Sequence, residues 1–152
     1  MEKQFITNSP SETKKLAQQL LKDFLKIKSK KALILGLEGD LGGGKTTFLQ
    51  GLSKGLGIKE KILSPTFIII RKFPIPFSKF KNFYHIDCYR IQKKKEVFNL
   101  HFKEIISNPE NIVTIEWVDK IKKFLPKKIL ILKFEFLNKN QRRITIKNFY
   151  ER

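Results

Sequence analysis

Apolar residues recur along this chain with two different periods, which predict helices and strands in alternation. Leucine, phenylalanine and isoleucine follow a helical spacing between residues 10 and 27, and Ser9, Pro10 and Glu12 form the start signal of that helix. A second helical pattern begins at Lys45 and ends near Gly57, a residue suited to a left-handed cap. Two further helices are expected at residues 93–106 and 118–125, the latter ended by a proline.

Runs of strand length separate these helices. The two runs before and after residue 80 fit an antiparallel hairpin or simply neighbouring strands, and the last two flank a polar turn and predict a terminal hairpin. Strands that first alternate with helices and later pair indicate an α/β three-layer fold, with a mixed sheet whose parallel central strands carry the ligand site, in a single domain over residues 1–152. The strand-like runs are residues 5–7, 30–39, 62–73, 82–91, 111–117, 127–136 and 142–149.

Composition narrows the function classes only a little. The formal net charge is +18, which favours a polyanionic partner, yet only five of the 32 basic residues are arginine. An A/T-rich coding sequence would give the same abundance of lysine, so contact with nucleic acid is left open. No apolar run is long enough to span a bilayer, and no export signal begins the chain, so a cytoplasmic protein without a membrane partner is expected. Cys88 is the single cysteine, which we expect to be a small buried side chain.

A glycine cluster between a strand and a helix carries the clearest chemical signal. Gly39, Gly44, Lys45 and Thr46 fit the pattern G-x-x-x-x-G-K-[ST] of a phosphate-binding loop. Glycines let the backbone turn its amide groups inward and approach phosphate oxygens closely. Lys45 is then expected to bridge the terminal phosphates and Thr46 to ligate magnesium.

Two acidic residues each end an apolar strand, as the magnesium site of such a loop requires. Glu116 closes the run at 111–116 and is expected to hold the metal. Asp87 is expected to orient or activate the attacking water, or to hold magnesium through a water molecule. Both lie at the same edge of the sheet if their strands run parallel to the loop strand. His85, two residues before Asp87, is expected to be a packed polar neighbour.

Four separated motifs make the chain resemble the TsaE family, formerly YjeE, of small bacterial P-loop ATPases. They are GDLGGGKTTFLQGL at 39–52, SPTF at 64–67, HIDCYRI at 85–91 and IEW at 115–117. The resemblance covers residues 5–120 and implies a P-loop NTPase-like fold, with ATP and Mg²⁺ as cofactors. It also implies a role in adding threonylcarbamoyl to the adenosine beside the anticodon of tRNA, together with TsaB and TsaD proteins, with slow hydrolysis by the free protein and with tRNA reached through the complex.

The resemblance also assigns roles to individual residues. It implies that Asp87 and Lys45 serve hydrolysis, that Thr46 and Glu116 hold magnesium, and that residues 64–66 match a mobile segment near the terminal phosphate. The residues expected to contact the nucleotide are Gly39, Asp40, Leu41, Gly42, Gly43, Gly44, Lys45, Thr46, Thr47, Thr66 and Trp117.

Three positions depart from the family pattern, and two other functions compete. Gly43 replaces a usual alanine without consequence, but His101 stands where glycine is common and Val118 where proline is common, which puts the local helix geometry in question. A small-molecule or nucleotide kinase shares the loop, although this chain has no arginine-rich lid. A basic RNA-binding module with a nucleotide-gated loop is the other alternative, and the intact loop with two strand-end acids argues against it.

Overall fold

A mixed sheet organises the chain, and the computed structural model describes residues 2–39, 42–63, 70–76, 78–89 and 101–148. Within these residues seven strands lie in the order β1-β7-β6-β2-β5-β4-β3. The four central strands, β6, β2, β5 and β4, are parallel, whereas β1 and β7 on one side and β3 on the other are antiparallel to their neighbours. The strands are β1 (Glu2–Thr7), β2 (Leu33–Gly39), β3 (Ile70–Pro74), β4 (Asn82–Asp87), β5 (Asn111–Glu116), β6 (Leu130–Phe136) and β7 (Arg142–Asn148).

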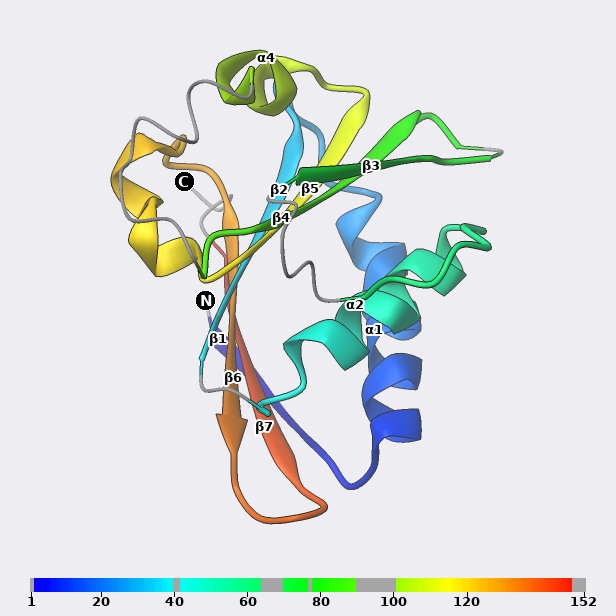
Figure 1. Cartoon of the computed structure of the whole chain (residues 1–152), viewed down its shortest axis with the longest axis vertical. Coiled ribbons are helices and arrows are strands. Elements are labelled where there is room, and N and C mark those ends of the chain that lie inside the picture. The colour runs from blue at the N-terminus through cyan, green and yellow to red at the C-terminus, as the bar shows by residue number, and fades with distance from the viewer. Residues whose placement is uncertain (1, 40–41, 64–69, 77, 90–100, 149–152) are drawn as a thin grey trace.

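Helices cover both faces of this sheet, which gives the three layers expected from the sequence. α1 (Pro10–Phe24) and α2 (Lys45–Gly55) lie on one face, as Figure 1 shows on its right-hand side. α4 (Phe102–Ser107) and the 3₁₀ helices η1 (Val118–Lys120) and η2 (Lys122–Phe124) lie against the other face. Two separate apolar clusters fill the space between the layers, one on each side of the sheet.

Local sequence signals explain how the two longer helices begin, end and meet. The Ser9 hydroxyl accepts a hydrogen bond from the Glu12 amide at 3.1 Å, which confirms the predicted N-cap. α1 ends at Phe24 rather than at Ile27, while Gly57 has the predicted left-handed conformation, with φ of 81°. Gly51 allows the two helices to touch, because a Cβ there would lie 2.4 Å from the Lys14 carbonyl oxygen.

The stretch at 118–125 is not the single helix that its apolar spacing predicts. It forms two 3₁₀ turns, because Ile121 leaves the helical conformation, with φ of −126°, and separates η1 from η2. Trp117, just before η1, adopts a left-handed conformation, with φ of 58°, directly after β5. Val118 is fully buried and lies over Gly36, where an added Cβ would come within 2.7 Å of its Cγ2. A valine at this position is therefore accommodated by a glycine in the neighbouring strand.

The predicted helix at 93–106 is confirmed only at its end, since residues 90–100 lie outside the described part of the chain. α4 begins at Phe102, after His101 in a left-handed conformation, with φ of 58°. Glycine adopts that conformation without strain, whereas His101 adopts it with a side chain attached.

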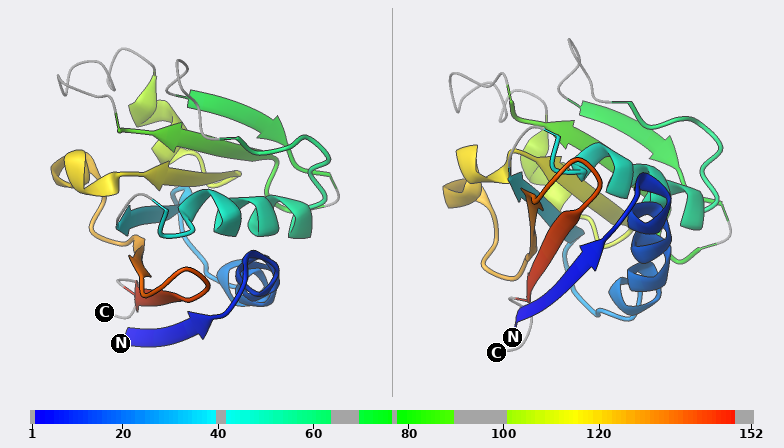
Figure 2. Two further views of the ribbon diagram at one scale, coloured as in Figure 1. Left: turned by 60° about the horizontal axis from the view of Figure 1, so that its bottom comes forward. Right: turned by 90° about the horizontal axis from the view of Figure 1, so that it is seen from below.

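The remaining strand predictions are resolved by the pairing. β3 and β4 form an antiparallel pair, and β6 and β7 form the expected hairpin. The run at 62–73 is a strand only from Ile70 among the described residues, and residues 64–69 lie outside them. Figure 2 shows β1 leading into α1 at the edge of the sheet beside β7.

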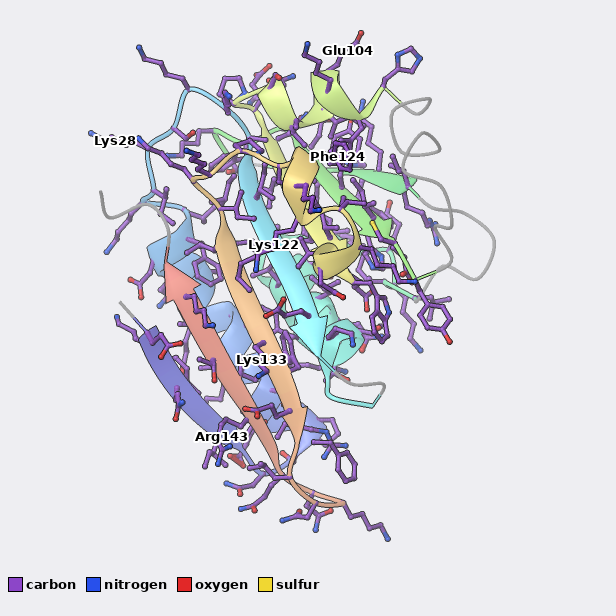
Figure 3. The ribbon with its side chains drawn as sticks, turned by 90° about the vertical axis from the view of Figure 1, so that its left-hand side faces the viewer. Lys28, Glu104, Lys122, Phe124, Lys133 and Arg143 are labelled. Carbon is purple, nitrogen blue, oxygen red and sulfur yellow. The ribbon has the colours of Figure 1, made fainter. Side chains whose placement is uncertain are left out.

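Part of the second sheet face carries charged side chains instead of helices. Lys133 and Arg143 project from β6 and β7 on the side away from α1 and α2 (Figure 3). Arg143 Nη1 lies 3.7 Å from Glu135 Oε2, and Lys147 Nζ lies 3.7 Å from Glu2 Oε1. This face therefore mixes both signs of charge.

Two smaller expectations concern membranes and the cysteine. Across the described ranges, no helix combines the length and the apolar character needed to cross a membrane. Cys88 is buried as expected, and its burial, with the nearby Asp87 carboxylate, raises the pKa of its thiol to about 12. The thiol is therefore unionised at neutral pH.

Candidate functional site

The carboxyl ends of three parallel strands bring the predicted site residues together. β2 ends at Gly39, β4 at Asp87 and β5 at Glu116. Asp87 and Glu116 are cross-strand neighbours, and Glu116 is also paired with Leu37 two residues before the loop. The sequence-based expectation that both acids lie at the same edge as the glycine loop is confirmed.

Three glycines of the loop adopt conformations that other residues avoid. Gly39, Gly42 and Gly44 have φ values of 130°, 75° and 100°. Gly39 also lies against β6, where an added Cβ would be 2.0 Å from the Phe134 carbonyl oxygen. α2 begins at Lys45, with Gly44 as its N-cap. Asp40 and Leu41 lie outside the described residues.

Lys45 is held inside the site at the start of α2. Its side chain is 6% exposed, and its Nζ donates a hydrogen bond of 2.7 Å to the Gly39 carbonyl oxygen. The same Nζ lies 4.2 Å from the centre of the Trp117 ring, which is a cation–π contact. Trp117 reaches this position through its left-handed backbone, and its ring also packs against Tyr89, with centroids 5.1 Å apart.

Thr46 and Glu116 face each other across the sheet edge. The Thr46 hydroxyl donates to Glu116 Oε1 at 3.4 Å, a long hydrogen bond. Glu116 Oε2 lies 2.5 Å from His85 Nε2, and both side chains are almost fully buried. A buried carboxylate beside a helix N-terminal hydroxyl is a pair of hard oxygen ligands suited to a divalent cation.

Asp87 lies beside this pair, on the same face of the sheet as His85. It is 8% exposed, and its Oδ1 accepts a hydrogen bond of 2.8 Å from the Tyr89 amide, which fixes the turn after β4. The predicted contact residue Thr66 falls in the range 64–69, outside the described residues.

A cavity of about 430 Å³ extends from the glycine loop across the sheet edge. Of the predicted and described residues, Gly39 and Asp87 do not line it, and the others do: Gly42, Gly43, Gly44, Lys45, Thr46, Thr47, Glu116 and Trp117. Two groups that the sequence reasoning missed also line it, one at the start of α1 and one at the β6–β7 turn. The missed residues are Asn8, Ser9, Pro10, Thr13, Lys139, Asn140 and Arg142.

Arg142 ties the C-terminal hairpin to the glycine loop. Its Nε donates to the Gly42 carbonyl oxygen at 2.8 Å, and its guanidinium lies 4.4 Å from the centre of the Phe136 ring. The Gln141 side chain also donates to Asn8 Oδ1 at 2.9 Å, so the hairpin contacts the start of α1 as well. The charge of Arg142 was visible in the sequence, but no local spacing connects it with a loop 100 residues away.

This combination of fold and loop defines a P-loop NTPase-like protein. The parallel part of the mixed sheet carries the glycine-rich segment at the carboxyl end of β2, and α2 follows that segment. The amide groups at the start of the helix, with the Lys45 ammonium, provide positive charge for an anion of polyphosphate type. Glu116 and Thr46 provide the oxygen atoms that a bound cation would need.

Similarity to known proteins identifies the family. The family described as "Threonylcarbamoyl adenosine biosynthesis protein TsaE" matches residues 7–144, and the chain belongs to this TsaE family. It is 37% identical to the tRNA threonylcarbamoyladenosine biosynthesis protein TsaE of Rickettsia felis, over 93% of this chain and 77% of that protein. It is 34% identical to the TsaE protein of Bacillus subtilis, over 95% of this chain and 87% of that protein.

A solved structure agrees with this assignment. The crystal structure of YdiB from Bacillus subtilis matches with a TM-score of 0.70 at 28% sequence identity, covering 98% of this chain and 86% of that one. The resemblance seen in four short motifs therefore extends over nearly the whole fold, including the terminal hairpin.

Proposed function

We propose that this protein binds and hydrolyses Mg-ATP as a component of tRNA threonylcarbamoyladenosine biosynthesis. Membership of the TsaE family supports the role in this pathway. The observation that best supports ATP binding is that Lys45, Thr46 and Glu116 lie together beside the glycine loop. Calorimetric titration with ATP in the presence and absence of magnesium tests the proposal. No binding in either condition would overturn it.

The site residues divide the work according to their chemistry. The loop amides and Lys45 bind and orient the phosphates, and Trp117 and the Arg142 hairpin enclose the cavity from two sides. Thr46 and Glu116 would hold Mg²⁺, which neutralises phosphate charge when bound. We assign to Asp87, next to Glu116 on β4, the role of orienting or deprotonating a water molecule at the terminal phosphate, which its position beside Glu116 supports.

The roles of the two acids lead to different expected defects. Glu116→Gln should raise the magnesium concentration needed for ATP binding on the order of tenfold, because a hard anionic ligand is lost. Asp87→Asn should leave Mg-ATP binding near normal and lower turnover about 100-fold, the scale of a general base. ATP titrations at several magnesium concentrations, run beside steady-state hydrolysis, measure both effects. The reverse pattern would mean that the two roles are exchanged.

The proposed assembly with TsaB and TsaD predicts that hydrolysis depends on partners. The purified chain should hydrolyse ATP slowly, and adding the TsaB and TsaD proteins of the same organism should raise the rate at least about tenfold. This increase is small beside the increase in kcat of roughly 10³–10⁵-fold that an arginine supplied by a partner protein gives other P-loop enzymes. Release of phosphate is the measurement, and the complex containing Lys45→Ala is the control. An unchanged rate in a demonstrated complex would refute the partner requirement, and direct contact with tRNA is not needed for it.

A further inference from the structure

A buried histidine holds one oxygen of Glu116 and leaves the other for the phosphate loop. His85 Nε2 lies 2.5 Å from Glu116 Oε2, while Oε1 of the same carboxylate faces the Thr46 hydroxyl at 3.4 Å. A carboxylate that binds a divalent cation is ionised and can only accept, so with a cation bound the donor of this short contact is the Nε2–H group of His85. The two oxygens of Glu116 therefore have different partners from different elements.

The other ring nitrogen shows that this contact does not serve packing alone. His85 is fully buried, and its Nδ1 has no hydrogen-bond partner among the described residues. An apolar side chain of similar size would fill the same space without an unpaired polar atom. A buried imidazole that makes one hydrogen bond, to the carboxylate of the candidate cation site, is better explained by what it does to that carboxylate.

From these contacts we infer that His85 is a positioning residue, which fixes the rotation of the Glu116 carboxylate so that Oε1 points toward Thr46 and a bound magnesium ion. This inference rests on the proposed function. The terminal torsion of a glutamate is intrinsically broad, so a donor to Oε2 removes freedom that would otherwise be lost on cation binding. His85 lies in the interior of β4, a rigid element, and is therefore suited to this task.

The decisive experiment compares three variants for magnesium-dependent ATP binding. His85→Leu should raise the magnesium concentration at half-saturation about tenfold or more, the usual scale for outer-shell partners of metal ligands, without changing ATP affinity in EDTA. His85→Gln, which retains an N–H donor at similar reach, should recover most of that loss. Calorimetry at a series of magnesium concentrations gives these values.

Thr114→Val is the matched control. Thr114 is the cross-strand neighbour of His85, and its buried hydroxyl donates to the Tyr84 carbonyl oxygen rather than to Glu116. This variant should lower thermal stability but leave the magnesium midpoint unchanged. If His85→Leu weakened ATP binding equally with and without magnesium, or if its midpoint matched that of Thr114→Val, His85 would be a structural residue and the inference would be overturned.

A second measurement needs no change at His85 and covers the case in which His85→Leu does not fold. The chain has two histidines, so ¹⁵N-histidine NMR separates buried His85 from exposed His101. The His85 ring should be the Nε2–H tautomer with a strongly downfield proton, and Glu116→Gln should move that proton upfield while the His101 signals stay. A proton on Nδ1 of His85, or a His85 proton whose chemical shift is the same in the wild type and in Glu116→Gln, would refute the contact.

The two proposals fail in distinguishable ways. If the ATP affinity of the wild-type protein does not depend on magnesium, both the metal part of the proposed function and the inference about His85 are overturned. Magnesium dependence that is weakened by Glu116→Gln but unchanged by His85→Leu leaves the proposed function standing and overturns only the role of His85.

Discussion

Replacing Lys45 by alanine is expected to abolish measurable ATP hydrolysis and to weaken ATP binding about 100-fold. The Lys45 ammonium is buried between the Gly39 carbonyl oxygen and the Trp117 ring, so it is already desolvated and close to the glycine loop. A hydrogen bond to a charged group contributes up to about 3 kcal/mol, which corresponds to about 100-fold in affinity. Calorimetry measures the affinity, and the single tryptophan provides an independent signal by fluorescence.

Lys54→Ala is the control for this prediction. Lys54 carries the same charge in the last turn of the same helix, but its side chain is exposed to solvent. It should bind and hydrolyse ATP like the wild-type protein. Unchanged affinity and turnover in Lys45→Ala would show that the glycine loop does not bind the phosphates in the way proposed.

The second large effect is expected on stability, from Gly39→Ala. A Cβ at Gly39 would lie 2.0 Å from the Phe134 carbonyl oxygen, and the backbone there has φ of 130°. Both the left-handed strain and the collision with β6 backbone oppose folding, so the free energy of unfolding should fall by about 3 kcal/mol. In a domain of this size that lowers the midpoint of thermal unfolding by roughly 10 °C.

Gly42→Ala separates the two causes. Gly42 has φ of 75°, yet an added Cβ would meet no atom of the described residues within 4 Å. This variant therefore tests strain without collision and should cost only about 1 kcal/mol. Equal losses in the two variants, measured by thermal and urea unfolding, would contradict the close approach of Gly39 to β6.

Much of the fold could be predicted because local patterns encode it directly. The start of α1, the glycine loop before α2 and the two strands that end in Asp87 and Glu116 all follow from residue type and spacing. The segment predicted as one helix at 118–125 is two 3₁₀ turns instead, because its apolar spacing says nothing of the backbone at Ile121, which leaves the helical conformation between them.

The sequence by itself determined the phosphate loop, the acids at the strand ends and the family, since each depends on neighbours along the chain. Tertiary structure alone decided which distant groups complete the site. Arg142 reaches the Gly42 carbonyl oxygen, and His85 reaches Glu116, only because strand order and register bring them together. Contacts between residues that are 31 or 100 positions apart cannot be predicted from the spacing of apolar residues. That spacing specifies which face of a helix or strand is buried, but not which other element packs against it.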